Sequence, residues 1–363
     1  MSSLLDNTLR HLKALVSFDT RNPPRNIGTD GIFSYLRDHL PGFAVEIVDH
    51  GAGAVSCLAV RGKPKYLFNV HMDTVPDSPA WSANPFELRV DGDRAVGLGA
   101  CDIKGAAAGL LAAANAVDGD AAFLFTSDEE ANDPRCIDAF LKRGLKFDAV
   151  LVAEPTQTRA VLAHRGISAV SMKFAGRAGH ASHKQQPGDS ALHQAVVWGN
   201  RALELVASME GEKFGGLSGL RFNIGRIEGG IKANVIAPEA SVRFGFRPLP
   251  SMDLDVLLER FRTLSEPPPV AFDETFRGPS LPSGDPMLAE ERRLAARDVA
   301  DELNLVVGNA VDFWTEASLF SAAGYTAMVY GPGDIAQAHA ADEWVSLEQL
   351  DAYAQSVSRI LQR

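Results

Sequence analysis

The chain has 363 residues, with 35 Lys and Arg against 46 Asp and Glu, so its formal net charge is −11. Its 46% apolar and 22% charged residues are typical of a globular protein, and the length predicts two or three domains at roughly 150 residues each. The acidic balance argues against a nucleic-acid partner, because such proteins normally carry a basic face. No apolar run approaches the roughly 20 residues that span a membrane, so we expect no membrane association.

The N-terminus and the cysteines indicate the compartment. The opening residues, Met-Ser-Ser-Leu-Leu-Asp-Asn, lack the basic residues with which a signal peptide begins. The chain has only three cysteines, Cys57, Cys101 and Cys136, which are too few for a disulfide framework and are expected to be reduced thiols. We therefore expect a soluble, cytoplasmic protein.

The first half of the chain predicts alternating helices and strands. Apolar residues at helical spacing indicate an amphipathic helix between Leu4 and Val16, and Pro23 and Pro24 follow it. An Ala- and Leu-rich stretch, Gly105–Val117, predicts a second helix. Three short apolar runs predict strands: Tyr66–Val70, Ala121–Thr126 and Ala149–Ala153. Such alternation indicates an α/β fold with a mostly parallel sheet covered on both faces.

The pattern changes at about Arg165. Six elements follow in the order β-α-β-β-α-β, at Ile167–Phe174, Ser190–Met209, Leu220–Ile227, Ala240–Phe246, Leu254–Leu264 and Val270–Glu274. This order is that of a small ferredoxin-like domain. Beyond it we expect a helix over Met287–Leu303, short apolar segments at Leu305–Val307 and Ala327–Tyr330, and a closing helix from Leu347. The sequence thus predicts a domain of residues 165–279, inserted into a larger α/β domain of residues 1–164 and 280–363.

Metal-ligating residue types follow the predicted strands of the larger domain. They are His71, Asp102, the adjacent pair Glu129 and Glu130, Glu154 and the distant His339. In open α/β sheets ligands bind at the carboxyl ends of strands. Carboxylates gathered there repel one another unless a cation neutralises them, and mixed imidazole and carboxylate ligation suits Zn²⁺, Co²⁺ or Mn²⁺. Two histidines and three carboxylates are enough for two ions that share a bridging carboxylate. The other glutamate of the pair is then available as a general base.

Four motifs also carry a resemblance: His71-Met72-Asp73-Thr74-Val75-Pro76, Gly99-Ala100-Cys101-Asp102-Ile103-Lys104-Gly105, Asp128-Glu129-Glu130 and Gly179-His180-Ala181-Ser182. Nearly the whole chain resembles the acetylornithine deacetylase, succinyl-diaminopimelate desuccinylase and glutamate carboxypeptidase family of dinuclear metallohydrolases. The resemblance implies one ion on His71, Asp102 and Glu154, and a second on Asp102, Glu130 and His339, with Asp102 bridging. It further implies that Glu129 is the general base and that Asp73 orients His71.

The resemblance extends to the inserted domain, which it identifies as the dimerisation domain of a homodimer. It implies that His180 stabilises the oxyanion in the active site of the partner subunit. Asn234 and Arg247 match positions that hold the carboxylate of the substrate, and the arginine fork suits that role. Arg243 alternates with Arg247 on the same predicted strand and competes with it as a candidate.

The resulting functional hypothesis is hydrolysis of the amide of an N-acyl amino acid with two divalent ions, Zn²⁺ or Co²⁺. Arg247-Pro248-Leu249-Pro250 and Thr315-Glu316-Ala317 resemble the acetylornithine deacetylase branch, and the whole chain resembles deacetylases that act on N-acetylcitrulline in arginine biosynthesis. Glu316 would suit either the cation of acetylornithine or the ureido group of acetylcitrulline, so acetylornithine is the alternative substrate. A di- or tripeptidase, and a dimeric binding protein without activity, are less favoured alternatives.

Overall fold

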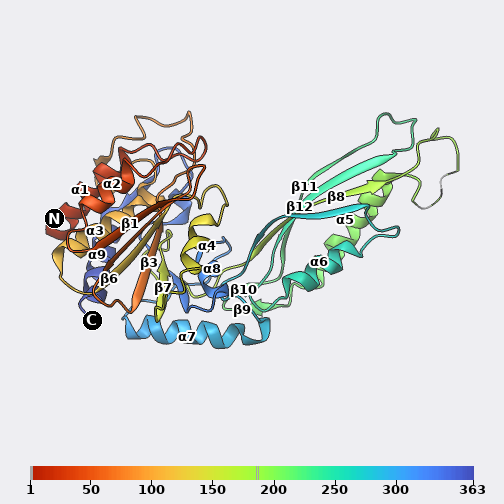
Figure 1. Ribbon diagram of the computed structural model, residues 1–363. Helices are drawn as coiled ribbons and strands as arrows, with labels where there is room; N and C mark the ends of the chain where they lie inside the picture. The colour runs from red at the N-terminus through yellow and green to blue at the C-terminus, as the bar shows by residue number, and fades with distance from the viewer. Residues whose placement is uncertain (1–2, 185, 187) are drawn as a thin grey trace. The chain divides into compact units, whose positions relative to one another are not determined.

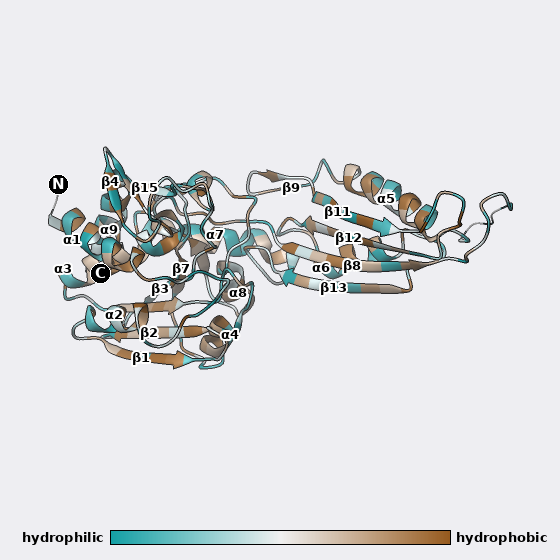
Figure 2. Ribbon diagram, turned by 90° about the horizontal axis from the view of Figure 1, so that it is seen from above, coloured by the Kyte–Doolittle hydropathy of each residue, from teal (hydrophilic) through white to brown (hydrophobic). Residues whose placement is uncertain are grey.

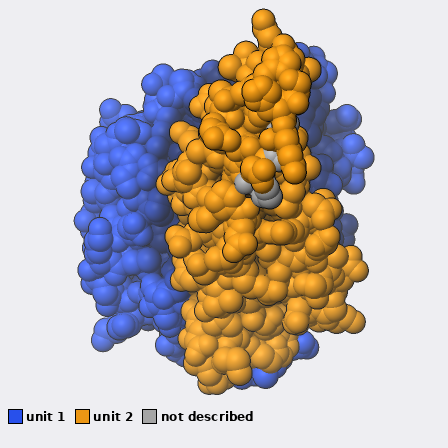
Figure 3. All heavy atoms as spheres, turned by 90° about the vertical axis from the view of Figure 1, so that its right-hand side faces the viewer, with its two compact units in different colours: residues 1–162, 294–308, 315–363 blue, residues 163–293, 309–314 orange. Residues whose placement is uncertain are grey.

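The computed structural model describes residues 3–184, 186 and 188–363, which divide into two compact units (Figure 3). Unit 1 comprises the described residues up to 162, together with 294–308 and 315–363; unit 2 comprises 163–293 and 309–314. Unit 2 thus extends beyond the expected end at 279, into helix α7 (Ala289–Glu302). The reason is that Ala289 packs in an apolar cluster of unit 2, whereas Ala296 and Ala300 join the core of unit 1.

The main sheet of unit 1 has six strands in the order β1-β2-β6-β3-β7-β14 (Figure 1). Their bounds are Ala44–Asp49, Val55–Arg61, Ala121–Thr126, Tyr66–His71, Ala149–Val152 and Ala327–Val329. β6, β3, β7 and β14 are parallel to one another, so the expected mostly parallel α/β fold is confirmed. The antiparallel strands β1 and β2 were not predicted. The expected segment Leu305–Val307 forms only an isolated bridge, between Val307 and Ala160.

Helices cover this sheet because their apolar residues face it. α1 (Ser3–Val16), α3 (Gly105–Ala116) and α9 (Leu347–Leu361) pack together on one face (Figure 1). The helices α3 and α9 come very close to each other. A Cβ atom added to Gly109 of α3 would lie 2.8 Å from the ring of Tyr353 in α9. The shorter helices of unit 1 are α2 (Ile32–Asp38), α4 (Arg135–Leu141) and α8 (Ala317–Ala322). No helix in the described part of the chain is long and apolar enough to cross a membrane.

A small three-stranded sheet completes unit 1, in the order β15-β5-β4. Its strands are β4 (Arg89–Asp91), β5 (Arg94–Val96) and β15 (Trp344–Ser346), all antiparallel. The pairing of β15 with β5 joins a segment near the C-terminus to the segment that leads into the turn Ala100–Lys104.

Unit 2 contains an antiparallel sheet in the order β11-β12-β8-β13. Its elements run in chain order as β8 (Ile167–Ala175), α5 (Ala191–Ala207), β11 (Arg221–Gly229), β12 (Glu239–Arg247), α6 (Leu254–Arg262) and β13 (Ala271–Gly278), with a small hairpin of β9 (Lys213–Phe214) and β10 (Leu217–Ser218). This is the predicted β-α-β-β-α-β order. Its core is aromatic: Trp198 lies against Phe244 and donates a hydrogen bond to the carbonyl oxygen of Phe261 at 2.8 Å. Figure 2 shows that α5 carries both apolar and polar residues.

Candidate metal centre and active site

The predicted ligand residues meet at the carboxyl ends of the parallel strands of unit 1. His71 is the last residue of β3, Glu129 and Glu130 follow β6, and Glu154 follows β7. Because β6, β3 and β7 are adjacent and parallel, these ends lie side by side. Asp102 reaches the same place from the irregular turn Ala100–Lys104, where its φ and ψ are −124° and 87°.

The donor atoms form two groups that share Asp102. In the first group, Nε2 of His71 lies 3.1 Å from Oδ1 of Asp102 and 3.9 Å from Oε1 of Glu154. In the second, Nε2 of His339 lies 3.2 Å from both Oδ2 of Asp102 and Oε1 of Glu130. Asp102 therefore presents one carboxylate oxygen to each group, as a bridging ligand would.

The chemistry of these groups fits divalent cations. Burial and the nearby charge of Asp102 raise the pKa of Glu154 well above its usual range. Burial would also raise the pKa of Asp102, but hydrogen bonds from His339 and His71 lower it. A divalent ion would offset the cost of burying these carboxylates together. Ligands about 2.0–2.1 Å from one tetrahedral ion lie about 3.3 Å apart, which is close to the observed separations.

Glu129 differs from its neighbour in its surroundings. It keeps part of its surface exposed, and among the described residues its carboxylate has no hydrogen-bond partner. Burial of the carboxyl group and the charge of Glu130 raise the pKa of Glu129 to about 8. Its oxygens are therefore free to accept and release a proton, whereas Glu130 is engaged with His339.

Asp73 is fully buried and joins several parts of the site. Its carboxylate accepts hydrogen bonds from Nδ2 of Asn22 and from the main-chain N–H of Glu130, both at 3.0 Å. Nδ1 of His71 lies 3.0 Å from the main-chain carbonyl oxygen of Asp73 but 3.6 Å from its carboxylate. The hydrogen bond that orients His71 therefore goes to the carbonyl, because 3.6 Å exceeds a normal hydrogen bond.

Three further buried side chains complete the surroundings in unit 1. Glu316 is 2% exposed, and burial together with the charges of Asp128 and Glu129 raises its pKa well above the usual range. Asn22 and Glu343, which contact the segments that carry the ligands, were not predicted. The sequence around Asn22, Asn22-Pro23-Pro24, does not indicate a role in the site. Glu343 follows His339 by only four residues, and this closeness could have indicated its role.

The candidate residues of unit 2 fall into two places. His180 is exposed and its Nδ1 lies 2.7 Å from Oγ of Ser182. Asn234 is its neighbour, because His180 forms a bridge with Val235 and the N–H of Ala181 donates to the carbonyl oxygen of Asn234 at 3.0 Å. Arg247 is instead the last residue of β12.

The strand β12 separates these two places. His180 and Asn234 lie beyond the end of the sheet at which Ala175 pairs with Glu239, the first residue of β12. Arg247 stands at the other end of the same nine-residue strand. At about 3.3 Å per residue, the strand β12 between them is about 26 Å long. One small substrate therefore cannot contact His180 and Arg247 of the same unit 2.

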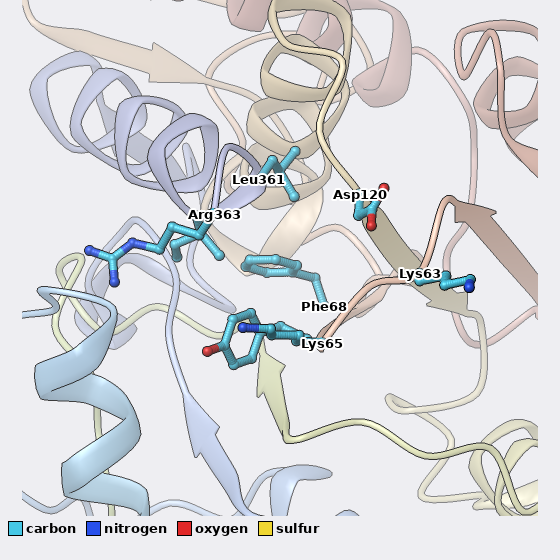
Figure 4. A pocket seen from close by; sticks show the side chains of 8 residues that line it. Lys63, Lys65, Phe68, Asp120, Leu361 and Arg363 are labelled. Atoms are coloured by element: carbon cyan, nitrogen blue, oxygen red, sulfur yellow. The ribbon is translucent and has the colours of Figure 1, made fainter.

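A pocket of about 80 Å³ in unit 1 is separate from the metal-ligating residues (Figure 4). Tyr66 and Phe68 line it from the start of β3, and Leu361 and Arg363 line it from the C-terminal end of the chain. His71 ends the same strand, so the pocket lies at the opposite edge of the sheet from the candidate metal centre.

Residues 67–363 match peptidase family M20/M25/M40. The chain belongs to this family. It is 71% identical over 362 residues to an N-acetyl-L-citrulline deacetylase of Xanthomonas campestris pv. campestris, with 99% of each chain covered. It is also 27% identical over 316 residues to an acetylornithine deacetylase of Pectobacterium carotovorum subsp. carotovorum, covering 83% of this chain and 80% of that one.

The fold of this M20/M25/M40 chain is also that of solved structures. It superimposes on the aminopeptidase PepT of Bacillus cereus with a TM-score of 0.74 and 20% identity, covering 99% and 98% of the two chains. As a member of the family the protein is a hydrolase, and its candidate metal-binding residues lie within the matched range, 67–363.

Proposed function

We propose that this protein hydrolyses N-acetyl-L-citrulline to citrulline and acetate, as a metal-dependent deacetylase of arginine biosynthesis in the cytoplasm. The observation that carries the proposal is the 71% identity, over 99% of both chains, to an N-acetyl-L-citrulline deacetylase. The two groups of ligating residues that share Asp102 support a hydrolytic metal site. N-acetylornithine is the second candidate, because relatives at 27% identity are acetylornithine deacetylases and because Glu316 is a buried carboxylate beside Glu129.

We assign the first ion to His71, Asp102 and Glu154, and the second to Asp102, Glu130 and His339, with Zn²⁺ or Co²⁺ as the metal. Such ions, when bound, lower the pKa of a water molecule and polarise the carbonyl group of the substrate. The two histidines are kept in position by different means: His71 by the carbonyl oxygen of Asp73, and His339 by the two carboxylates that it contacts.

In the proposed reaction Glu129 transfers the proton and His180 stabilises the developing negative charge. Glu129 takes a proton from the attacking water, whose oxygen forms a bond to the acetyl carbon. His180 donates a hydrogen bond to the oxyanion that develops on the carbonyl oxygen. When the bond from carbon to nitrogen breaks, Glu129 delivers the proton to the leaving amine, and acetate and the free amino acid result. The carboxylate of Glu129 has no hydrogen-bond partner among the described residues, and burial raises its pKa to about 8; both observations support this role.

We infer that the active site is completed by a second copy of the chain. Within one chain the strand β12, about 26 Å long, lies between the position of His180 and that of Arg247, so we infer that the two residues reach one substrate from different subunits. Unit 2 carries surfaces suited to a homodimer. β11 is an edge strand, and α5 exposes Val196 and Leu203, which are 61% and 57% exposed and lie on one helix face.

Chelation is expected to abolish the activity, and re-addition of Zn²⁺ or Co²⁺ is expected to restore it at two ions per chain. The physical reason is that the two groups of ligands have five different side chains, with Asp102 common to both. Elemental analysis of the chelated and the reconstituted protein checks this prediction. Full activity with only trace metal would contradict it.

Arg247→Lys is expected to lower kcat/KM for N-acetylcitrulline by about 10- to 150-fold, because it removes a charged bidentate hydrogen bond worth about 1.5–3 kcal/mol. The α-amide of the same substrate has no carboxylate to lose, so its kcat/KM is expected to change little. Steady-state kinetics on both substrates measures the difference. An equal loss of kcat/KM on the amide would mean that Arg247 has a structural role. Arg243, which is exposed on the same face of β12, would then be the next residue to test.

The experiment that tests the proposed function is a panel of N-acetyl amino acids, with unacylated dipeptides included, assayed with metal-replete protein. We expect the highest kcat/KM on N-acetylcitrulline. Glu316→Gln is expected to reduce the activity on the cationic acetylornithine more than that on the neutral acetylcitrulline, since only the former loses a charge partner. Higher activity on dipeptides would overturn the proposal in favour of a peptidase.

A further inference from the structure

The carboxylate of Glu343 accepts three hydrogen bonds from the turn that carries Asp102. Its Oε2 accepts from the main-chain N–H of Gly99 at 2.9 Å. Its Oε1 accepts from the N–H groups of Cys101 and Asp102 at 2.8 and 2.9 Å. The side chain is buried, with 2% of the residue exposed, so water does not replace these bonds.

Glu343 also connects two of the three segments that carry the second group of ligands, those of Asp102 and His339. Glu343 follows His339 by four residues and precedes β15 directly. Its main-chain carbonyl oxygen accepts from Gly97 at 3.0 Å, so both its backbone and its side chain hold the segment from Gly97 to Asp102. The contact between His339 and Asp102, at 3.2 Å, therefore depends on how Glu343 joins the two segments.

The turn itself is irregular and needs such support. Asp102 and Ile103 have non-helical φ and ψ angles within the turn Ala100–Lys104, which the hydrogen bond from the N–H of Lys104 to the carbonyl oxygen of Gly99, at 2.7 Å, spans. Lys104, fully buried in the same turn, donates a hydrogen bond to the carbonyl oxygen of Phe18 at 3.0 Å. Its positive charge attracts the carboxylate of Glu343 and offsets part of the cost of burying that carboxylate.

We propose that Glu343 is a positioning residue for the bridging carboxylate: by gathering the N–H groups of Gly99, Cys101 and Asp102, it holds Asp102 between His71 and His339. The inference rests on the proposed two-metal site and adds to it a residue that touches neither metal nor substrate. Residues in such supporting positions typically change metal affinity or activity by about 10- to 100-fold when they are replaced.

Glu343→Gln is the primary test because it keeps the shape of the side chain. The amide replaces one acceptor oxygen by an NH₂ group, which then faces at least one N–H donor of the turn. Glu343→Asp is the second variant, since it keeps the charge but withdraws both oxygens by one methylene. Glu348→Gln, at an exposed position in the first turn of α9, is the matched control.

The measurements use the full-length chain, stripped of metal and titrated with Co²⁺. For Glu343→Gln we expect at least one of two ions to bind about 10- to 100-fold more weakly, with a changed Co²⁺ absorption spectrum. At saturating metal we expect kcat to fall while KM changes little. Glu343→Asp should lie between the wild type and Glu343→Gln, and Glu348→Gln should equal the wild type. Thermal unfolding of the metal-free proteins separates loss of stability from loss of metal affinity.

Two results would overturn the proposal. One is a Glu343→Gln protein that binds both ions with wild-type affinity and spectrum, whatever its melting temperature. The other is failure of both Glu343 variants to fold, which would give the residue a role in folding instead of positioning. The proposed function is tested separately by the wild type: a wild type that hydrolyses no N-acetyl amino acid, yet loses Co²⁺ affinity on Glu343→Gln, would overturn the function and retain the positioning role.

Discussion

Glu129→Gln is expected to lower kcat by about 10²- to 10⁴-fold while both metal ions stay bound. The glutamine keeps the volume of the side chain but cannot take a proton from water. Because Glu129 belongs to neither group of ligating residues, its replacement leaves every ligand in place. Steady-state kinetics, together with metal analysis of the same preparation, measures both parts of this prediction.

The neighbouring substitution provides the contrast. Glu130→Gln is expected to weaken metal binding, because Oε1 of Glu130 lies 3.2 Å from Nε2 of His339 within the second group of ligands. Glu291→Gln, at an exposed position in the first turn of α7, is the control for loss of a carboxylate elsewhere. Equal loss of metal from the Glu129 and Glu130 variants would mean that their two roles are wrongly assigned.

Mixing two inactive variants is expected to restore about a quarter of the wild-type activity. If His180 acts in the partner's active site, a heterodimer of His180→Ala and Glu129→Gln has one site with both residues intact. Random exchange of equal amounts makes about half of the dimers mixed, and each has one good site of two. Activity is measured before and after verified subunit exchange.

The controls for this experiment are each variant mixed with itself, which should stay inactive. His183→Ala removes an exposed histidine whose ring lies 6.4 Å from that of His180, and it should stay active alone. No recovery after verified exchange would place the action of His180 within its own chain and would contradict the inference from the two ends of β12.

Local patterns were enough to predict the strands that carry the site. β3, β6 and β7 are short, apolar and buried along their whole length, and the polar residues that follow them stand out for this reason. Because parallel strands bring their carboxyl ends to one edge, the order of the motifs also predicted that His71, the Glu129 and Glu130 pair and Glu154 would meet. The antiparallel strands β1 and β2 were missed, since no motif follows them.

Only the tertiary structure showed which distant residues hold the site residues in place, and that His180 and Arg247 lie far apart. The hydrogen bond from Asp102 to Glu343 joins residues 241 positions apart, and that from Asn22 to Asp73 joins residues 51 apart. Contacts at such separations leave no periodicity in a sequence. His180 and Arg247 were both predicted as site residues, but the sequence did not show that they lie at opposite ends of one sheet. Their placement follows from the register of β12 against β8, which depends on strand pairing.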